Sequence, residues 1–364
     1  MPVTRELPAL VPEPRVESTR PNGAVRIAAI DIGSNSIRQI VADVSPDGAI
    51  VHVDDMKAAP RLASGLESSG ALEEESMARA IAALAHMASL AKKLNADRIV
   101  AVATSAVRDA SNAAEFLRRV KSQTGLELRV LTGDDEARLS YRSALAHFEL
   151  GNSRTAVVDL GGGSLELALS HDGIVDRLMS LPLGAVRLTE RFLAGGDGPK
   201  RLAKLRRHVA EVIRKNVPVR PWRGARLIGA GGTFTNLAGM ILSRDGIFSA
   251  RSVQGAVATR NDVEHMLDTL AAMTVEERRK VEGLNQARAD IIVAGLSVVA
   301  ELMARLEARE VEVSRYGIRE GILLEAARIT PVVADPGEAR ERSVMELARK
   351  CKNEMPHAEQ VRML

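Results

Sequence analysis

Two short segments of the chain combine a carboxylate, glycine and serine in the same order, and both could bind phosphate. The first is Asp31-Ile-Gly-Ser-Asn-Ser-Ile37, and the second is Asp159-Leu-Gly-Gly-Gly-Ser-Leu165. Each follows an apolar run that predicts a β-strand, and each predicts a turn whose backbone N–H groups point to one side. Such turns bind phosphate oxygens. Because the pattern occurs twice in equivalent positions, it predicts two domains built on one plan.

A third glycine-rich turn, Gly229-Ala-Gly-Gly-Thr233, follows another predicted strand and begins a predicted helix, a geometry that also favours anions. One such turn by itself is as often a simple hairpin, but three of them on a repeated plan favour a phosphate site. The phosphate-binding candidates in the three turns are Gly33, Ser34, Asn35, Ser36, Gly161, Gly162, Gly163, Ser164, Gly231, Gly232 and Thr233.

Carboxylates stand where the two predicted strands end, so they would face the phosphate. Asp31 and Asp159 would repel a phosphate unless a cation lay between, and Mg²⁺ (or Mn²⁺) binds one or two carboxylates together with substrate phosphates. Glu166 lies two residues after Ser164 on the outgoing strand and therefore shares its face. We expect Asp31, Asp159 and Glu166 to contribute to a metal site, with a solvent-facing position as the alternative for Glu166.

Two further charged residues could act in the same cleft. Arg108, at the end of Thr104-Ser-Ala-Val-Arg108, could clamp phosphate through its planar guanidinium, and the alternative is a capping or surface salt-bridge role. Glu136 lies in Thr132-Gly-Asp-Asp-Glu-Ala137, where acidic residues also occur because they complement the dipole of a starting helix. The functional interpretation makes Glu136 the base for an attacking water, and the spacing leaves both interpretations open.

Composition excludes several classes of function. The single cysteine, Cys351, rules out a disulfide framework and a cysteine-built zinc site. Aromatic residues make up 2% of the chain, which argues against the stacking platforms of single-strand nucleic-acid binders. With no apolar run of membrane-helix length and no secretory signal, we expect a cytoplasmic protein without nucleic-acid or membrane partners. Most of the many arginines reflect composition, but Arg38 and Arg251 are further candidates for phosphate.

Hydrophobic periodicity and turn signals predict the elements that position these residues, and their alternation gives an α/β fold class. Predicted strands cover 25–31, 37–44, 49–56, 98–104, 127–131, 155–159, 164–170, 174–179, 225–230 and 310–314. Predicted helices cover 72–94, 111–122, 134–148, 184–194, 200–216, 234–243 and 317–329. We expect a disordered arm (1–24), a first domain (25–150), a second domain (151–316), a helix packing back on the first domain (317–330) and a peripheral tail (331–364).

With these motifs in place, the chain resembles the exopolyphosphatase / guanosine pentaphosphate phosphatase (Ppx/GppA) family, within the superfamily of actin, heat-shock chaperones and sugar kinases. The matching segments are AIDIGSNSIRQIVADV (29–44), VATSAVRDASNAAEFL (102–117), LTGDDEARLSY (131–141), VVDLGGGSLELAL (157–169), LPLGAVRLTERF (181–192), IGAGGTFTNLAG (228–239), ADIIVAGLSVV (289–299) and VSRYGIREGILLE (313–325). The resemblance implies two RNase H-like domains facing across a cleft. It also implies Mg²⁺-dependent hydrolytic release of terminal phosphate from polyphosphate or pppGpp.

The resemblance further implies roles for single residues. It makes Glu136 the catalytic base, places Asp159 and Glu166 near the metal and the nucleophilic water, and assigns phosphate to Asn35, Ser36, Arg108 and the loop 161–164. Two positions depart from the family pattern: Leu165 replaces a usual threonine, and Asp134-Asp135 replaces a more Glu-rich stretch, which makes Asp135 a second candidate base. The chain also ends before the C-terminal His-Asp domain of longer members.

Two other functions stay open on the sequence alone. One is a kinase or polyphosphate:ADP phosphotransferase of the same superfamily, and the other is a non-enzymatic nucleotide sensor or actin-like assembly protein. Glu136 beside three phosphate-binding turns favours the hydrolase. We expect polyphosphate or pppGpp as the substrate and allow for a homodimer.

Overall fold

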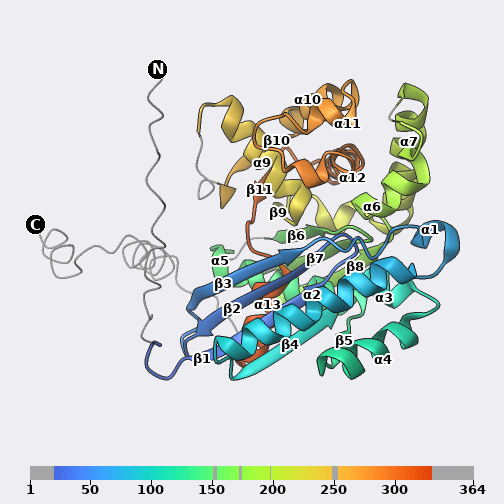
Figure 1. Cartoon of the computed structure of the whole chain (residues 1–364). Coiled ribbons are helices and arrows are strands. Elements are labelled where there is room, and N and C mark those ends of the chain that lie inside the picture. The colour runs from blue at the N-terminus through green and yellow to red at the C-terminus, as the bar shows by residue number, and fades with distance from the viewer. Residues whose placement is uncertain (1–19, 151–153, 172–173, 197, 248–252, 330–364) are drawn as a thin grey trace, which may run out of the picture.

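The computed structural model describes residues 20–150, 154–171, 174–196, 198–247 and 253–329, which fold around two β-sheets (Figure 1). The first sheet has the strand order β3-β2-β1-β4-β5. Its strands are β1 (Val25–Ile32), β2 (Ile37–Val44), β3 (Ile50–Ala58), β4 (Arg98–Ala103) and β5 (Leu128–Val130). The second sheet has the order β10-β11-β9-β6-β7-β8. Its strands are β6 (Thr155–Leu160), β7 (Leu165–His171), β8 (Ile174–Leu181), β9 (Arg226–Ala230), β10 (Val257–Thr259) and β11 (Glu310–Val313).

The two sheets share one topology. In each, three consecutive strands form an antiparallel meander, and the first of them also pairs in parallel with a later strand: β1 with β4, and β6 with β9. Asp31 and Asp159 occupy equivalent places near the ends of β1 and β6. The predicted α/β fold with two halves of one plan is therefore confirmed, and β10, which the sequence did not predict, adds a short antiparallel edge strand beside β11.

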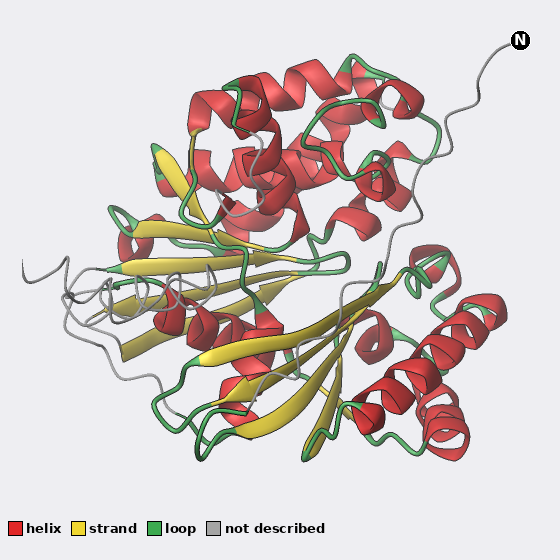
Figure 2. Cartoon of the chain, turned by 60° about the vertical axis from the view of Figure 1, so that its left-hand side comes forward, coloured by secondary structure: helices red, strands yellow, loops and turns green. Residues whose placement is uncertain are grey.

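Most of the helices cover the outer faces of the two sheets (Figure 2). The first half contributes α1 (Leu66–Ser69), α2 (Glu74–Lys93), α3 (Ser105–Asp109), α4 (Ala113–Thr124) and α5 (Gly133–His147). The second half contributes α6 (Ala185–Leu188), the π-helical turn η1 (Thr189–Leu193), α7 (Pro199–Asn216), α8 (Val219–Trp222), α9 (Gly232–Arg244), α10 (Arg260–Ala271), α11 (Val275–Arg278), the 3₁₀ turn η3 (Gln286–Arg288) and α12 (Ile292–Leu306). The chain then continues from β11 into α13 (Ile318–Ala326).

Helices α5 and α13 form a layer between the two sheets (Figures 1 and 2). Helix α13 packs on β1, β2 and β4, helix α5 packs on β6, β7 and β8, and the two helices contact each other. Leu139 of α5 joins the core cluster of the first sheet, whereas Tyr141 joins a cluster with residues of the second sheet. The helix that carries Glu136 is therefore held by both halves of the molecule.

The ends of the expected domain plan fall partly outside the described residues, which exclude 1–19 of the expected arm and the tail 331–364. Within the expected arm, Arg20 forms ion pairs with Asp97 at 2.9 Å and with Asp43 of β2 at 3.7 Å, and Ala24 is buried. Contacts with the first sheet therefore begin before Val25. No described helix is both long enough and apolar enough to cross a membrane.

Candidate active site

A narrow cleft of about 140 Å³ lies where the ends of β1 and β6 meet the beginnings of α9 and α13. The predicted residues that line it are Asp31, Gly33, Asn35, Ser36, Asp159, Gly161, Gly231 and Gly232. The structure thus brings together both strand-end aspartates and part of each of the three glycine-rich turns, although these segments lie far apart in the sequence.

Four arginines line the same cleft: Arg38, Arg288, Arg315 and Arg319. Burial lowers the pKa of Arg38, and the nearby charge of Arg319 lowers it further. Burial likewise lowers the pKa of Arg288 to about 10, with a further contribution from Arg38. Within the described residues, Arg319 is the only one of these four arginines that forms an ion pair, and its partner is Asp55 at 2.6 Å. Because these positive groups crowd together, the cleft favours a polyanion.

The two aspartates in the cleft differ in their partners. Asp159 Oδ2 accepts a hydrogen bond of 2.6 Å from Ser140, whereas Asp31 Oδ1 is buried and has no hydrogen-bond partner within the described part of the chain. Burial raises the pKa of both side chains, that of Asp31 to about 6. A buried carboxylate oxygen without a donor fits a bound cation, so Asp31 and Asp159 are suited to hold Mg²⁺.

The predicted metal residues do not form a closed protein cage. Over the described ranges, no group of three or more His, Cys, Asp or Glu side chains gathers closely enough to hold a metal ion. Mg²⁺ commonly keeps several waters and takes further ligands from substrate phosphates. The arrangement therefore suits a cation that arrives with, or is completed by, a phosphate chain.

The remaining charged candidates form a compact group that does not line the cleft. Glu136, 6% exposed, forms an ion pair with Arg108, whose guanidinium also donates to the Leu131 carbonyl at 3.0 Å. Glu166, 4% exposed, lies directly opposite Asp159 in the β6–β7 pairing, so its solvent-facing alternative is wrong. Arg108 is directed to Glu136 and does not line the cleft, so its role as a phosphate clamp stays a prediction.

Burial raises the pKa of both buried glutamates. The charge of Glu166 raises the pKa of Glu136 further, while the ion pair with Arg108 opposes this shift. Once ionised, a carboxylate of raised pKa is a stronger base than an ordinary one. Arg108 stabilises that ionised form of Glu136. The pair could therefore act as a general base with its counter-ion.

The first two glycine-rich turns pack directly against each other. Ser34 Oγ lies 3.1 Å from Ser105 Oγ, and a Cβ at Gly163 would lie only 2.3 Å from Ser105 Oγ. Gly162 is similarly close, since a Cβ there would lie 2.9 Å from that of Ser34. As a result Ser34, Gly162 and Gly163 sit in the contact between the halves and do not line the cleft. Ser164 is buried and does not line the cleft either, and its side chain is hydrogen-bonded to Glu166.

Known proteins resemble this chain over most of its length. Residues 40–329 match the family model described as the Ppx/GppA phosphatase family. The chain belongs to this family. Exopolyphosphatase 1 of Mycobacterium tuberculosis is 32% identical over 303 residues, covering 82% of this chain and 88% of the relative. Exopolyphosphatase 2 of the same species is 34% identical over 317 residues, covering 83% of this chain and 98% of the relative.

Solved Ppx/GppA structures share the fold. A structure of an exopolyphosphatase from Cytophaga hutchinsonii has a TM-score of 0.78 at 25% identity and covers 85% of this chain and 100% of that one. The Ppx/GppA family member from Aquifex aeolicus has a TM-score of 0.72 at 30% identity and covers 84% of this chain and 98% of that one. The predicted family is therefore confirmed.

Two residues that the sequence offers for the site, Thr233 and Asp135, have other roles in this Ppx/GppA chain. Thr233 is buried with its side chain close to Gly295 of α12, and Thr235 lines the cleft in its place, because the second residue of α9 faces the core. Asp135 caps α5 by accepting hydrogen bonds from Thr132, which lowers the pKa of the carboxyl. Asp135 is thus a capping residue, and Glu136 stays the predicted base.

Leu165, which departs from the Ppx/GppA pattern, is fully buried in the core of the second half. Among the additional phosphate candidates, Arg38 lines the cleft and Arg251 lies outside the described residues. The sequence motifs missed Arg288, Arg315 and Arg319. Arg38 can be predicted as a site residue from the sequence, because the expected pairing of the first two strands sets it opposite Asp31. No local sequence signal identifies Arg288 as a site residue.

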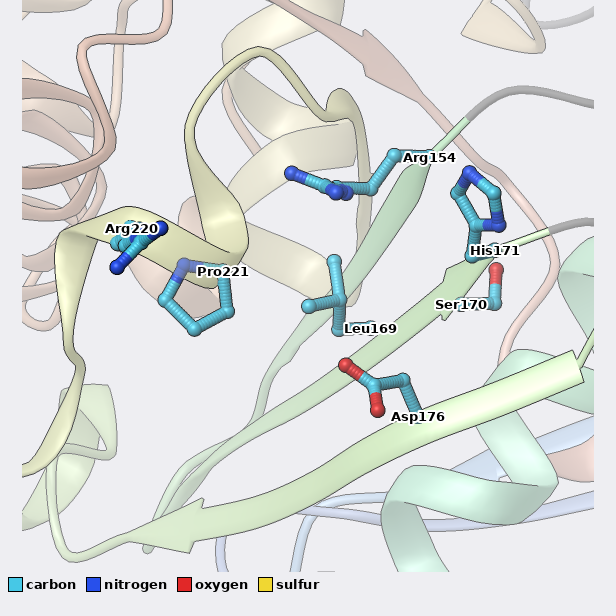
Figure 3. A pocket seen from close by; sticks show the side chains of 7 residues that line it. All are labelled: Arg154, Leu169, Ser170, His171, Asp176, Arg220 and Pro221. Carbon is cyan, nitrogen blue, oxygen red and sulfur yellow. The ribbon is translucent and has the colours of Figure 1, made fainter.

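A larger hollow of about 520 Å³ lies at the opposite ends of β6 and β7, and Figure 3 shows Arg154 and His171 among its lining residues. Arg154 precedes Asp159 by five residues along one extended strand, which places the hollow roughly 17 Å from the cleft. No residue predicted for the phosphate site lines it. The larger hollow is therefore separate from the candidate active site.

Proposed function

We propose that the protein is an exopolyphosphatase, a Mg²⁺-dependent hydrolase that removes the terminal phosphate of inorganic polyphosphate, with the 5′-terminal phosphate of pppGpp as a second substrate. The observation that carries this proposal is the cleft in which four arginines surround Asp31 and Asp159. The names of the two mycobacterial relatives, both exopolyphosphatases, support the same substrate class. A long polyanion suits a site with this excess of guanidinium groups.

The cleft and the buried glutamates divide the work of hydrolysis. The arginines would bind the phosphate chain, and a Mg²⁺ ion held by Asp31 and Asp159, with Glu166 nearby, would supply charge neutralisation of its oxygens. Glu136 would accept a proton from water while the water oxygen bonds to the terminal phosphorus. The bridging P–O bond then breaks, and the shortened chain leaves with the electron pair.

Arg108 and the turn N–H groups complete this scheme. Through its ion pair with Glu136, Arg108 would orient the base, and we assign its guanidinium also to the equatorial phosphoryl oxygens, whose charge it would stabilise in the transition state. Gly33, Asn35 and Gly161 present the part of the turns that lines the cleft. Positioning and electrostatics account for most of the acceleration in phosphoryl transfer, and this site offers both.

The test is phosphate release from long-chain polyphosphate and from pppGpp, side by side, with and without Mg²⁺. We expect Glu136→Gln to retain the fold and substrate binding while turnover falls at least ~100-fold. Asp135→Asn is the matched control, because it changes the neighbouring carboxylate of the same helix and leaves a residue that can still cap. Near-normal turnover in Glu136→Gln would falsify the assignment of the base.

The same assay separates the alternatives. ATP formed on adding ADP would indicate a phosphotransferase, and tight nucleotide binding without phosphate release would indicate a sensor. Sedimentation on adding nucleotide would indicate an assembly protein. The homodimer and the cytoplasmic location stay predictions from the sequence.

A further inference from the structure

The two buried acids at the junction of β6 and β7 each accept a hydrogen bond from a serine that lies outside the phosphate-binding turns. Asp159 Oδ2 accepts from Ser140 Oγ at 2.6 Å, and Glu166 Oε1 accepts from Ser180 Oγ at 2.8 Å. The two acids face each other across β6 and β7 and are almost completely enclosed by protein. Away from water, an ionised carboxylate needs nearby hydrogen-bond donors, which stabilise its charge and fix its orientation.

Ser140 lies one helical turn after Glu136, so both side chains leave α5 on the same face. Its hydroxyl reaches across to Asp159. By contrast, the Ser297 hydroxyl in α12 donates to a carbonyl one turn earlier in its own helix, which is a common use of a helical serine. Ser143, also buried on α5, has a hydroxyl with no hydrogen-bond partner in the described part of the chain. The hydrogen bond of Ser140 to Asp159 therefore depends on the position of Ser140 on α5 next to β6, and not on a general preference of serines in helices.

Ser180 reaches Glu166 from the next strand, where β7–β8 pairing sets the two residues opposite each other. The first residue of α5, Gly133, packs directly against Ser180. A Cβ on Gly133 would lie 2.1 Å from the Cβ of Ser180, so only glycine lets the start of α5 pack this closely on β8. The start of α5 thus presents Glu136 and Ser140 and also confines Ser180 beside Glu166.

We propose that Ser140 and Ser180 are positioning residues, which hold Asp159 and Glu166 in the orientation that the cation, the water and the terminal phosphate require. This inference rests on the proposed function. The hydroxyls act through the two carboxylates, since neither serine lines the cleft. Donors of this kind behind metal-binding carboxylates typically change metal affinity or activity by 10–100-fold when they are removed.

The experiment compares Ser140→Ala and Ser180→Ala with the control Ser143→Ala in the full-length protein. The readouts are kcat and KM for polyphosphate, the Kd of Mn²⁺ measured by electron paramagnetic resonance, and the melting temperature. We expect the first two variants to lose about 10-fold in kcat and in Mn²⁺ affinity with KM nearly unchanged. Ser143→Ala should match the parent, because its hydroxyl has no described partner to lose.

A pair of nearly isosteric variants guards against simple loss of folding. Ser140→Thr keeps the hydroxyl and Ser140→Val replaces it with a methyl group, so retention of kcat and Mn²⁺ affinity in the first alone supports the proposal. Equal values in both variants overturn it. If the parent hydrolyses polyphosphate and the alanine variants match Ser143→Ala, the positioning role fails while the proposed function stands. If the parent releases no phosphate, the proposed function fails, and unchanged Mn²⁺ affinity in Ser140→Ala overturns the positioning role independently.

Discussion

The two halves of the molecule carry rows of side chains on equivalent backbone positions, and the net charges of these rows are opposite in sign. Across three neighbouring strands, the first half aligns Asp31, Arg38 and Lys57. The second half aligns Asp159, Glu166 and Ser180 in the same places. The first row is net positive and the second is net negative, although one sheet topology supports both. The repeat therefore fixes where these side chains stand, and their residue types make one row suited to a phosphate chain and the other suited to a cation.

Burial acts on the two rows in opposite directions. It lowers the pKa of Arg38 and of Lys57, and it raises the pKa of Asp159 and Glu166. In each row the dominant charge is disfavoured by its surroundings. Under the proposed function, a phosphate chain with its cation would supply the missing counter-charge to both rows at once, from a site between the two halves.

The largest effect is expected from removing the second charge of the negative row. Glu166→Gln keeps the shape and can still accept from Ser180, but it removes the negative charge near the proposed cation and water. We expect kcat for polyphosphate to fall about 100-fold, measured by phosphate release. Glu310→Gln, an exposed glutamate on the same sheet, is the control. A kcat within a few-fold of the parent would show that the rows do not divide the work as described.

A smaller effect, and a different kinetic parameter, is expected in the positive row. Arg38→Met removes a cleft guanidinium, and we expect KM for polyphosphate to rise about 10-fold with kcat much less changed, because the loss is in binding. Arg177→Met, which changes an exposed arginine of β8, should leave both parameters unchanged. A loss confined to kcat would contradict the assignment of Arg38 to anion binding.

The smallest effect concerns stability, and its sign should differ between the rows. The folded state binds the Glu166 proton more tightly than the unfolded chain, so this residue destabilises the parent increasingly as pH rises above about 4.3. The melting temperature of Glu166→Gln relative to the parent should therefore increase between about pH 5 and 8, the range that the raised pKa opens.

Lys57 should behave in the reverse sense. Its pKa is lowered, so the folded state loses the proton more readily and parent stability rises with pH until about 10.5. Any advantage of Lys57→Met should thus stay constant between about pH 5 and 7 and shrink at alkaline pH. Melting temperatures of Glu166→Gln and Lys57→Met, each measured relative to the parent from about pH 5 to alkaline pH, test both predictions. If the two differences changed with pH in the same direction, the rows would not differ in their electrostatics as described.

Much of this site could be predicted from local signals. The strand-ending aspartates Asp31 and Asp159 and the turns that follow them are marked by residue type and order, and both aspartates line the cleft. Glu136 was placed near a helix start by the same reasoning. Thr233 was misplaced, because which face of α9 meets the cleft depends on packing against α12. Arg288 was missed, because it lies in a short 3₁₀ turn without a motif.

Periodicity and turn signals, which act over a few residues, predict every described strand except β10, and they also predict the glycine-rich turns, the repeated plan and the family. Local signals do not reveal that the first two turns pack on each other, that four arginines converge, or that Ser140 and Ser180 reach the buried acids. These contacts join residues from separate elements. They exist because α5 and α13 pack between the two sheets and bring both halves to one cleft.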